Sequence, residues 1–222
     1  MSKIHPEALK IVPPIALVLL IISGVLTFIF RDSLTGIIIV WVLALVFIFL
    51  FTLFFRFPKR PRPQNGRKVY SSADGKVVVI EEVMEKEYFG EKRIQLSVFM
   101  SITNVHINWS PVTGKVIYEK YKPGRFFPAW MPKSSALNEH NTFVVETHSG
   151  HQIMVRQIAG AVARRIAVYK RCGDEVKAGD QLGFIRFGSR VDLFLPLGSE
   201  IKVNIGQHVQ GSRTLLAILP PA

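Results

Sequence analysis

The residue pair with the most unusual chemical potential is Gly188-Ser189, in the stretch GFIRFGSRVDLFLP at residues 183–196. The pair separates two strand-like runs, and a glycine followed by a serine between strands is ordinarily a turn. A hydrolase nucleophile would instead lie in Gly-x-Ser-x-Gly on a turn from a strand into a helix, whereas Arg190 and Val191 lead into another strand. Two interpretations therefore stay open: an ordinary turn, or chemistry on the backbone itself.

Backbone chemistry at this pair would convert a serine into a cofactor. Ser189 Oγ can attack the Gly188 carbonyl carbon, which turns the amide into an ester. Glycine suits the upstream position because it has no Cβ to obstruct the attack and tolerates unusual φ and ψ angles. Loss of the Ser189 α-proton then eliminates the ester to dehydroalanine, whose hydrolysis leaves an N-terminal pyruvoyl group. The chain would become two chains.

Such a rearrangement needs a group that moves protons, and histidine is the usual one because its pKa lies near neutral pH. Six histidines are present, and two of them, His106 in FMSITNVHINWSP and His140 in NEHNT, lie between the expected strands. Asp74, in SSADGKV, is by its local sequence expected to cap an Asp-Gly turn. The other four histidines precede the first apolar run or lie beside turn signals, where histidines are commonly solvated: His5, His148, His151 and His208.

Basic and aromatic residues near these segments are candidates for binding a substrate. An arginine guanidinium offers a planar fork that matches a phosphate or a carboxylate, although a solvated surface is the other interpretation. An apolar loop, GRFFPAWMP, would either enter a lipid interface or pack as an ordinary loop. The arginines are Arg164, Arg165, Arg186 and Arg190, and the loop residues are Phe126, Phe127, Trp130 and Met131.

Two apolar runs, residues 11–30 and 34–55, are separated only by the polar residues 31–33. Each is about twenty residues long, which is the length that a helix needs to cross the hydrocarbon core. A cleaved secretory signal has a shorter apolar region and is disfavoured. We therefore expect a transmembrane hairpin over residues 1–56. Basic residues flank both outer ends, so the positive-inside rule places both ends in the cytoplasm.

The rest of the chain begins with a basic, proline-rich linker at residues 57–67. The formal net charge of the 222 residues is +12. For a membrane-tethered chain, basic residues beside the membrane are most simply explained by anionic headgroups, at about 1 kcal/mol each, and not by nucleic acid. The single cysteine, Cys172, excludes an internal disulfide framework.

Residues 68–222 consist of short β-branched runs between turn residues, which is typical of an antiparallel sandwich or barrel. The one helical segment is expected around AGAVARRIAVYK, at residues 159–170. A weak repeat, GDEVKAGDQLGFI and GSEIKVNIGQHV, resembles the two halves of a lipoyl/biotinyl-type barrel-sandwich hybrid. We therefore expect a mainly β domain of this class with minor α structure. No lysine lies between the halves, so a cofactor-carrier role is disfavoured.

Five motifs occur together and in order: SSADGKV, FMSITNVHINWSPVTG, NEHNTFVVET, RQIAGAVARRI and RFGSRVDLFLP. The chain from about residue 69 to 219 resembles the short, membrane-anchored class of phosphatidylserine decarboxylase proenzymes. The resemblance implies self-cleavage between Gly188 and Ser189 into residues 1–188 and 189–222, which stay bound to each other. It also implies a covalent pyruvoyl cofactor made from Ser189, with no metal. The ketone would condense with the amine of the serine headgroup and accept the electron pair released with CO2.

The resemblance also implies roles for individual residues. His106 matches the histidine associated with decarboxylation, and Asp74 matches the aspartate of a processing Asp-His-Ser triad. The second histidine of the usual His-x-x-His is Trp109 here, and an indole has no lone pair to take a proton. Either His106 serves both steps, oriented directly by Asp74, or another group assists. His140, which replaces a basic residue, joins Arg165, Arg186 and Arg190 as a candidate for binding substrate.

The implied reaction is the decarboxylation of phosphatidylserine to phosphatidylethanolamine at the cytoplasmic side of the cell (inner or plasma) membrane. Archaetidylserine or another serine phospholipid would undergo the same headgroup chemistry, and a homo-oligomer is compatible with the sequence. A different class of protein is a non-catalytic, membrane-anchored adaptor that docks a partner through its lipoyl-like barrel. An adaptor would stay one intact chain.

Overall fold

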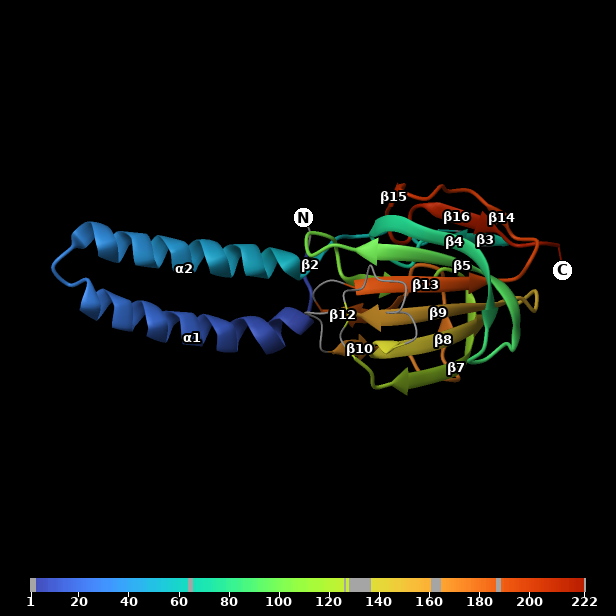
Figure 1. The fold of residues 1–222 in the computed structure, drawn as a ribbon, viewed down its shortest axis with the longest axis horizontal. Coiled ribbons are helices and arrows are strands. Elements are labelled where there is room, and N and C mark those ends of the chain that lie inside the picture. Colours follow the sequence, from blue (N-terminus) through green and yellow to red (C-terminus); the bar gives the residue numbers. More distant parts are fainter. Residues whose placement is uncertain are drawn as a thin grey trace. The chain divides into compact units, whose positions relative to one another are not determined.

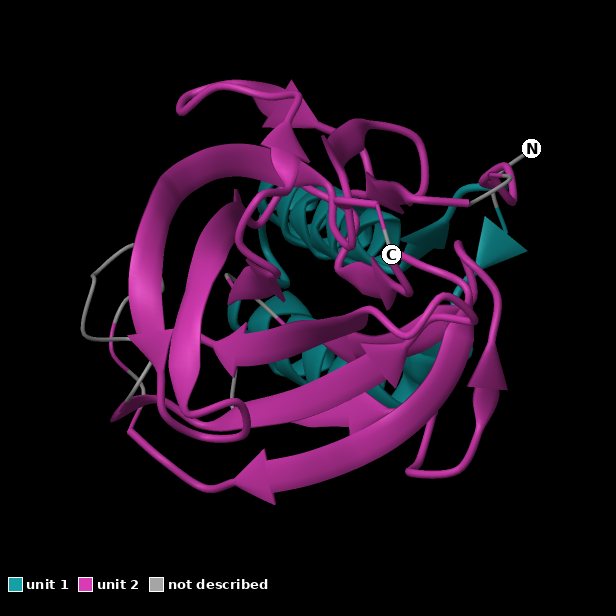
Figure 2. Cartoon of the chain, turned by 90° about the vertical axis from the view of Figure 1, so that its right-hand side faces the viewer, with its two compact units in different colours: residues 1–59 teal, residues 60–222 magenta. Residues whose placement is uncertain are grey.

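The computed structural model describes residues 3–63, 66–125, 127, 137–160, 165–186 and 189–221. The chain divides into two compact units, residues 1–59 and residues 60–222, which are coloured separately in Figure 2. The expected linker at residues 57–67 spans the boundary between them. Each unit is described by itself.

The first unit is a helical hairpin. The Ser33 side chain caps the second helix by accepting a hydrogen bond from the Gly36 N–H at 3.1 Å. The Trp41 indole donates a hydrogen bond across the hairpin to the Thr27 hydroxyl at 3.0 Å. A two-stranded antiparallel pairing joins the two outer ends of the hairpin. The elements are β1 (Lys3–Ile4), α1 (Glu7–Ile29), α2 (Leu34–Phe54) and β2 (Arg56–Phe57).

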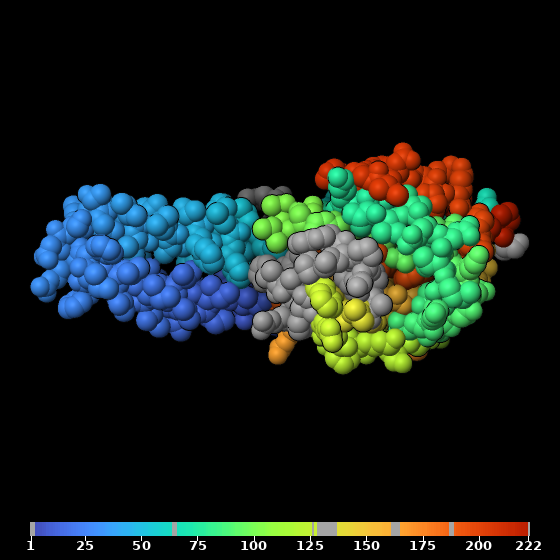
Figure 3. Space-filling model, in the orientation of Figure 1, coloured from blue at the N-terminus to red at the C-terminus, as the bar shows by residue number. Residues whose placement is uncertain are grey.

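Both helices are long and apolar enough to cross a membrane. Large apolar side chains stay exposed along them, among them Leu17, Phe28, Leu43 and Phe47. In the space-filling view these helices form the blue surface (Figure 3). An exposed apolar surface of this kind is costly in water, so the hairpin indicates membrane association.

The second unit is built on one curled, eight-stranded antiparallel sheet, whose long strands lie side by side in Figure 1 and curve in the view of Figure 2. The strand order is β11-β7-β8-β9-β13-β5-β4-β15. Their bounds are β4 (Gly75–Glu85), β5 (Glu91–Met100), β7 (Gly114–Lys122), β8 (His140–Glu146), β9 (Gln152–Ala159), β11 (Glu175–Val176), β13 (Ser189–Leu195) and β15 (His208–Val209).

Two three-stranded sheets complete this unit, with orders β10-β12-β6 and β14-β16-β3. The first copy of the sequence repeat forms β11 and β12, and the second forms β14 and β15. The expected mainly β fold with an N-terminal helical hairpin is confirmed. The bounds are β3 (Lys68–Tyr70), β6 (Ile107–Trp109), β10 (Ile166–Val168), β12 (Gln181–Ile185), β14 (Glu200–Ile201) and β16 (Leu215–Ile218).

Strand β13 shows how the alternating pattern sorts side chains onto two faces of the large sheet. Ser189, Val191 and Leu193 point into the main core, which also takes side chains from the neighbouring strands. Arg190 and Asp192 point to the opposite face. The strand is buried on both faces along its whole length, because it lies in the interior of the sheet.

The expected helix at residues 159–170 is wrong where the structure describes it. Ala159 is the last residue of β9, and residues 166–168 form β10; residues 161–164 lie outside the described residues. Strand β10 pairs antiparallel with β12, from Ile166 opposite Ile185 to Val168 opposite Gly183. Tertiary pairing of the β-branched Ile166 and Val168 therefore outweighs the helical propensity of the neighbouring alanines and arginines.

Candidate active site

Pairings at the two ends of the connection from β5 to β6 bring Ser189 to His106. Met100 ends β5 and pairs with Ser189, the first residue of β13. At the other end, the Ile185 N–H donates to the His106 carbonyl at 3.1 Å, just before β6. The chain therefore passes from β5 to β6 through residues 101–106, and the end of β12 and the start of β13 lie near the two ends of that connection. Residues 83 positions apart in sequence become neighbours.

Ser189 and His106 are both fully buried, and their side chains meet. Ser189 Oγ lies 3.3 Å from His106 Nδ1, and His106 Nε2 lies 3.0 Å from the Ser101 carbonyl oxygen. A carbonyl oxygen only accepts hydrogen bonds, so Nε2 carries the ring proton and Nδ1 presents its lone pair to the serine. His106 is thereby positioned to take the Ser189 hydroxyl proton.

Asp74 belongs to a different cluster, which it forms with a residue from the start of the second unit. Its Oδ2 accepts a hydrogen bond from Arg60 Nη2 at 2.5 Å, and its Oδ1 accepts one from the Gly211 N–H at 2.7 Å. The hydrogen bond described for His106 Nε2 goes to the Ser101 carbonyl oxygen. Direct orientation of His106 by Asp74 stays a prediction.

Trp109, at the position of the usual second histidine, packs into the same cluster as Asp74. The Arg60 guanidinium lies over the indole, 5.5 Å from the ring centre. The indole also occupies the space that a Cβ on residue 211 would need, so Gly211 is required there. The indole is therefore a packed, cation-stacked core group and not a proton acceptor.

Arg190 is buried on the sheet face opposite Ser189. Its Nε donates to Asp192 Oδ1 at 2.6 Å, and its Nη2 donates to Ser97 Oγ at 2.8 Å. The side chain is 2% exposed. The guanidinium charge is already neutralised by a buried carboxylate, which is the arrangement that a buried cation requires.

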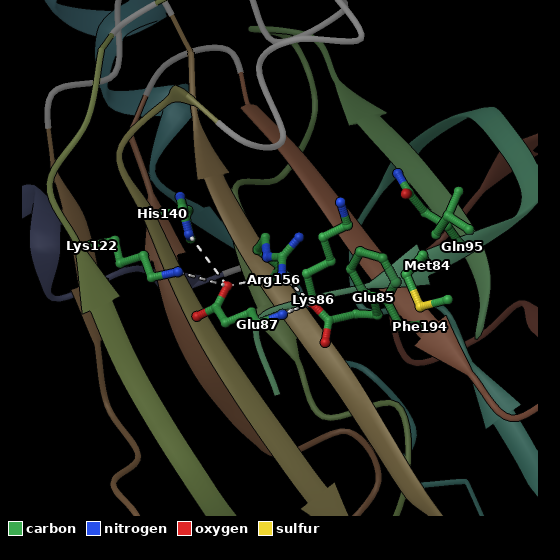
Figure 4. A pocket seen from close by; sticks show the side chains of 10 residues that line it. Met84, Glu85, Lys86, Glu87, Gln95, Lys122, His140, Arg156 and Phe194 are labelled. Carbon is green, nitrogen blue, oxygen red and sulfur yellow. Dashed lines mark hydrogen bonds and ion pairs between the residues drawn. The ribbon is translucent and has the colours of Figure 1, made fainter. Parts of the chain in front are cut away.

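His140 lines an open pocket of about 380 Å³ beside β4, β8 and β9 (Figure 4). Its Nδ1 lies 2.7 Å from the Asn138 carbonyl oxygen, and its Nε2 lies 3.6 Å from Glu87. Both His140 and Arg190 pair with Ile158 of β9, from either side. His140 is therefore two strand spacings, about 10 Å, from β13. The structure does not bring it to Ser189.

Glu87 is the centre of this pocket, where Arg156, Lys122 and His140 converge on its carboxylate (Figure 4). Burial by itself would raise the pKa of Glu87. The hydrogen bond from His140 and the charges of Arg156 and Lys122 outweigh burial and lower the pKa to about 2. Glu87 is therefore ionised at neutral pH and compensates the cations around it.

The other predicted binding residues are scattered. Arg165 is exposed, and its charge acts on buried Glu139: burial raises the pKa of Glu139, and Arg165 opposes that rise. Arg186 is half-buried directly after β12, three positions before Ser189. Phe127 is half-buried, with its N–H bonded to Asn138 Oδ1 at 2.9 Å. Gly188, Arg164, Phe126, Trp130 and Met131 lie outside the described residues.

Sequence motifs did not reveal every group around Ser189. The Ser101 carbonyl acts through the backbone, which leaves no side-chain signature. Met100 Sδ lies 3.2 Å from Ser189 Oγ. Met100 belongs to β5, whose sequence has the pattern of an ordinary core strand. Within the described ranges, no group of three or more histidine, cysteine or acidic residues is placed to hold a metal.

Comparison with known proteins places these residues in a family context. A sequence model described as phosphatidylserine decarboxylase matches residues 47–217. A protein named phosphatidylserine decarboxylase proenzyme from Bacteroides thetaiotaomicron is 45% identical over 218 residues, 98% of this chain and 95% of its own. Proteins of the same name from Amoebophilus asiaticus and Porphyromonas gingivalis are 51% and 50% identical, over 74% and 79% of this chain and 73% and 80% of their own.

Proposed function

The chain belongs to the phosphatidylserine decarboxylase family, and we propose that it works through a pyruvoyl group made by its own cleavage between Gly188 and Ser189. It is an enzyme that decarboxylates phosphatidylserine to phosphatidylethanolamine. Its relatives are named as proenzymes, which indicates self-processing in the family. The cleavage position and the cofactor are the parts that we propose.

One contact carries the proposal: the 3.3 Å approach of Ser189 Oγ to the lone pair of His106 Nδ1. His106 takes the hydroxyl proton as Oγ adds to the carbonyl of residue 188, and it returns that proton to the departing amide nitrogen. The bond from the carbonyl carbon to nitrogen breaks, and an ester forms. This arrangement needs no second histidine, so it fits a chain with Trp109 at that position.

The later steps also start from residue 189. Removal of the Ser189 α-proton breaks the bond from Cβ to the ester oxygen, which leaves a carboxylate on residue 188 and dehydroalanine at residue 189. Hydrolysis of this dehydroalanine then releases its nitrogen as ammonia and leaves a ketone at the α-carbon of residue 189. When present, this group supplies an electron sink for the pair released with CO2. His106, which lies beside residue 189, is the candidate to return a proton to the substrate carbon.

The sheet topology supports a cleaved enzyme that stays together. Residues 189–222 would contain β13, β14, β15 and β16. Strand β13 pairs with β5 on one side and with β9 on the other, and β15 and β16 pair with β4 and β3. Every one of these partners belongs to residues 1–188, so the small piece is held by backbone hydrogen bonds after the cut.

For the membrane, we propose a hairpin anchor at residues 1–56, a linker at 57–67 and a catalytic domain at 68–222. The pairing of β1 with β2 supports a hairpin whose two ends lie on one side of the bilayer. Lys3 and Arg56 flank the helices at those ends, which favours the cytoplasmic side of the cell membrane. The anchor would hold the enzyme in the same bilayer as its lipid substrate.

Mass spectrometry of the full chain, purified in detergent, tests the proposal. The 25.0 kDa chain should appear as pieces of about 21 and about 4 kDa, in proportion to 188 and 34 of its 222 residues, with a pyruvoyl group blocking the smaller piece. Ser189→Ala should stay intact and inactive. An uncut wild-type chain that still releases CO2 from phosphatidylserine vesicles would exclude both the cleavage and the cofactor, and an intact chain without activity would favour the adaptor.

A further inference from the structure

A row of amide side chains is buried between the large sheet and the β6-β12 pair, on the same side of the large sheet as Ser189. Asn108 on β6, Gln157 on β9 and Asn141 on β8 are all 0% exposed. Gln157 Nε2 donates a hydrogen bond to Asn108 Oδ1 at 2.6 Å. Asn141 pairs directly with Gln157 across the two strands.

This row is energetically expensive. The Oδ1 and Nδ2 atoms of Asn141 and the Oε1 atom of Gln157 are buried without a hydrogen-bond partner in the described part of the chain. An unsatisfied buried polar group costs about 1–3 kcal/mol, whereas an apolar side chain of the same shape would cost nothing. Leucine or methionine at these positions would suit a purely structural core better.

The row ends beside the reacting serine. Asn108 Nδ2 lies 3.6 Å from Met100 Sδ, and Ser189 Oγ lies 3.2 Å from the same sulfur. A thioether is a weak acceptor, so the Asn108 amide donor is only weakly satisfied where it stands. Gln157 holds the Oδ1 end of that amide, so the NH2 end lies against the same sulfur atom that Ser189 Oγ contacts.

Gly183 keeps the row in place. A Cβ on residue 183 would lie 2.7 Å from Gln157 Nε2, and it would also collide with the Ala167 carbonyl. The Gln157 amide therefore rests on the bare backbone of β12, opposite Asn108 in the β6-β12 pairing. The backbone of one strand is shaped to receive a polar side chain from another sheet.

We propose that Asn108 is a donor of the reacting centre, and that Gln157 is the residue that positions it. Negative charge develops when Ser189 Oγ gives up its proton and adds to the peptide carbonyl. A neutral, fixed N–H donor in a water-excluded core stabilises such charge without reorganisation. The inference rests on the proposed self-cleavage, because it assigns two further residues to that step.

The test measures self-cleavage of the full chain, made by cell-free synthesis in the presence of phosphatidylserine-containing vesicles and followed by intact mass over time at several pH values. Asn108→Leu removes the donor, and Asn108→Asp removes it while keeping an oxygen for Gln157. Both should slow cleavage by about 100-fold or more, the usual effect of losing such a donor. Gln157→Met should slow cleavage less, because Asn108 stays but loses its support.

Ser110→Ala is the matched control. Ser110 is also fully buried, lies directly after β6 and donates one hydrogen bond, to the Val112 carbonyl at 2.7 Å, so its loss tests the general effect of a buried polar deletion near this strand. It should cleave at the wild-type rate. Thermal unfolding of each variant in a Ser189→Ala background separates lost folding from lost chemistry.

The pH profile distinguishes a donor from a purely structural residue. The residual cleavage of Asn108→Leu should keep the wild-type dependence on pH, because leucine adds no titratable group beside His106. Wild-type rates in the Asn108 variants, a shifted profile in Asn108→Leu, or an equal loss in Ser110→Ala would overturn the role of Asn108 and leave the proposed function standing. A wild-type chain that never cleaves would overturn the proposed function itself.

Discussion

Replacing Glu87 by glutamine should destabilise the second unit, and the loss should depend on pH. Glu87 is 7% exposed and receives Arg156, Lys122 and His140. Burial raises its pKa, and these three partners more than compensate, which lowers the pKa from 4.5 to about 2. Glutamine keeps the size of the side chain but removes the charge that the partners require.

The pKa gives the magnitude and the sign. Each pKa unit corresponds to about 1.4 kcal/mol, so a shift from 4.5 to about 2 stabilises the folded state by about 3 kcal/mol. Because the folded pKa is lowered, the stabilisation is fully present above pH 4.5 and is lost as the pH falls towards 2. At pH 3 less than half of it should be left, so the wild type and the variant should converge there.

Thermal unfolding of the uncleaved Ser189→Ala chain in detergent, with and without Glu87→Gln, measures the effect. About 3 kcal/mol corresponds to a midpoint lower by about 6–12 °C at pH 7 for a chain of this size. Glu91→Gln is the control, because Glu91 is 58% exposed beside Arg93 and should change stability by less than about 1 kcal/mol. An equal difference between variant and parent at pH 7 and pH 3 would refute the charge-based reasoning.

Three further predictions follow from packing and pairing. Glu85→Gln should lower the midpoint by several degrees, because the carboxylate accepts three backbone N–H bonds from residues 87–89, and hydrogen exchange should report faster opening of that turn. Gly211→Ala should cost about 1–3 kcal/mol by forcing the Trp109 ring aside, measured in the same melts. After cleavage, residues 189–222 should co-purify with the large piece in detergent and separate only in denaturant, since β13 is paired on both sides; dissociation under native conditions would contradict the fold.

Much of the site could be predicted from the sequence, because its chemistry depends on residue types. The Gly188-Ser189 pair, the buried-strand pattern around it and the histidine of a recognisable motif pointed to Ser189 and His106, and the structure brings those two side chains together. The two apolar runs likewise marked the helical hairpin, since helix length against bilayer thickness is a local property of the chain.

Other features depended on partners that the sequence does not name. Arg190 looked like a substrate ligand but is paired with buried Asp192, and His140 lies in the Glu87 cluster two strands from β13. Arg190 was assigned from its closeness to Ser189 in sequence and His140 from the family position that it occupies, whereas strand alternation and register decide which face a side chain enters.

The sequence alone determined the chemical inventory of this protein: an apolar anchor, a mainly β domain, and a serine and a histidine suited to self-cleavage. The tertiary structure decided which carbonyl orients that histidine, which predicted substrate ligand is already paired with a carboxylate, and that a row of buried amides lies on the same sheet face as the serine. The physical reason is that the type of a residue is fixed locally, whereas its hydrogen-bond partner depends on strands brought together from distant parts of the chain. That partner in turn decides the tautomer and the charge that the residue presents.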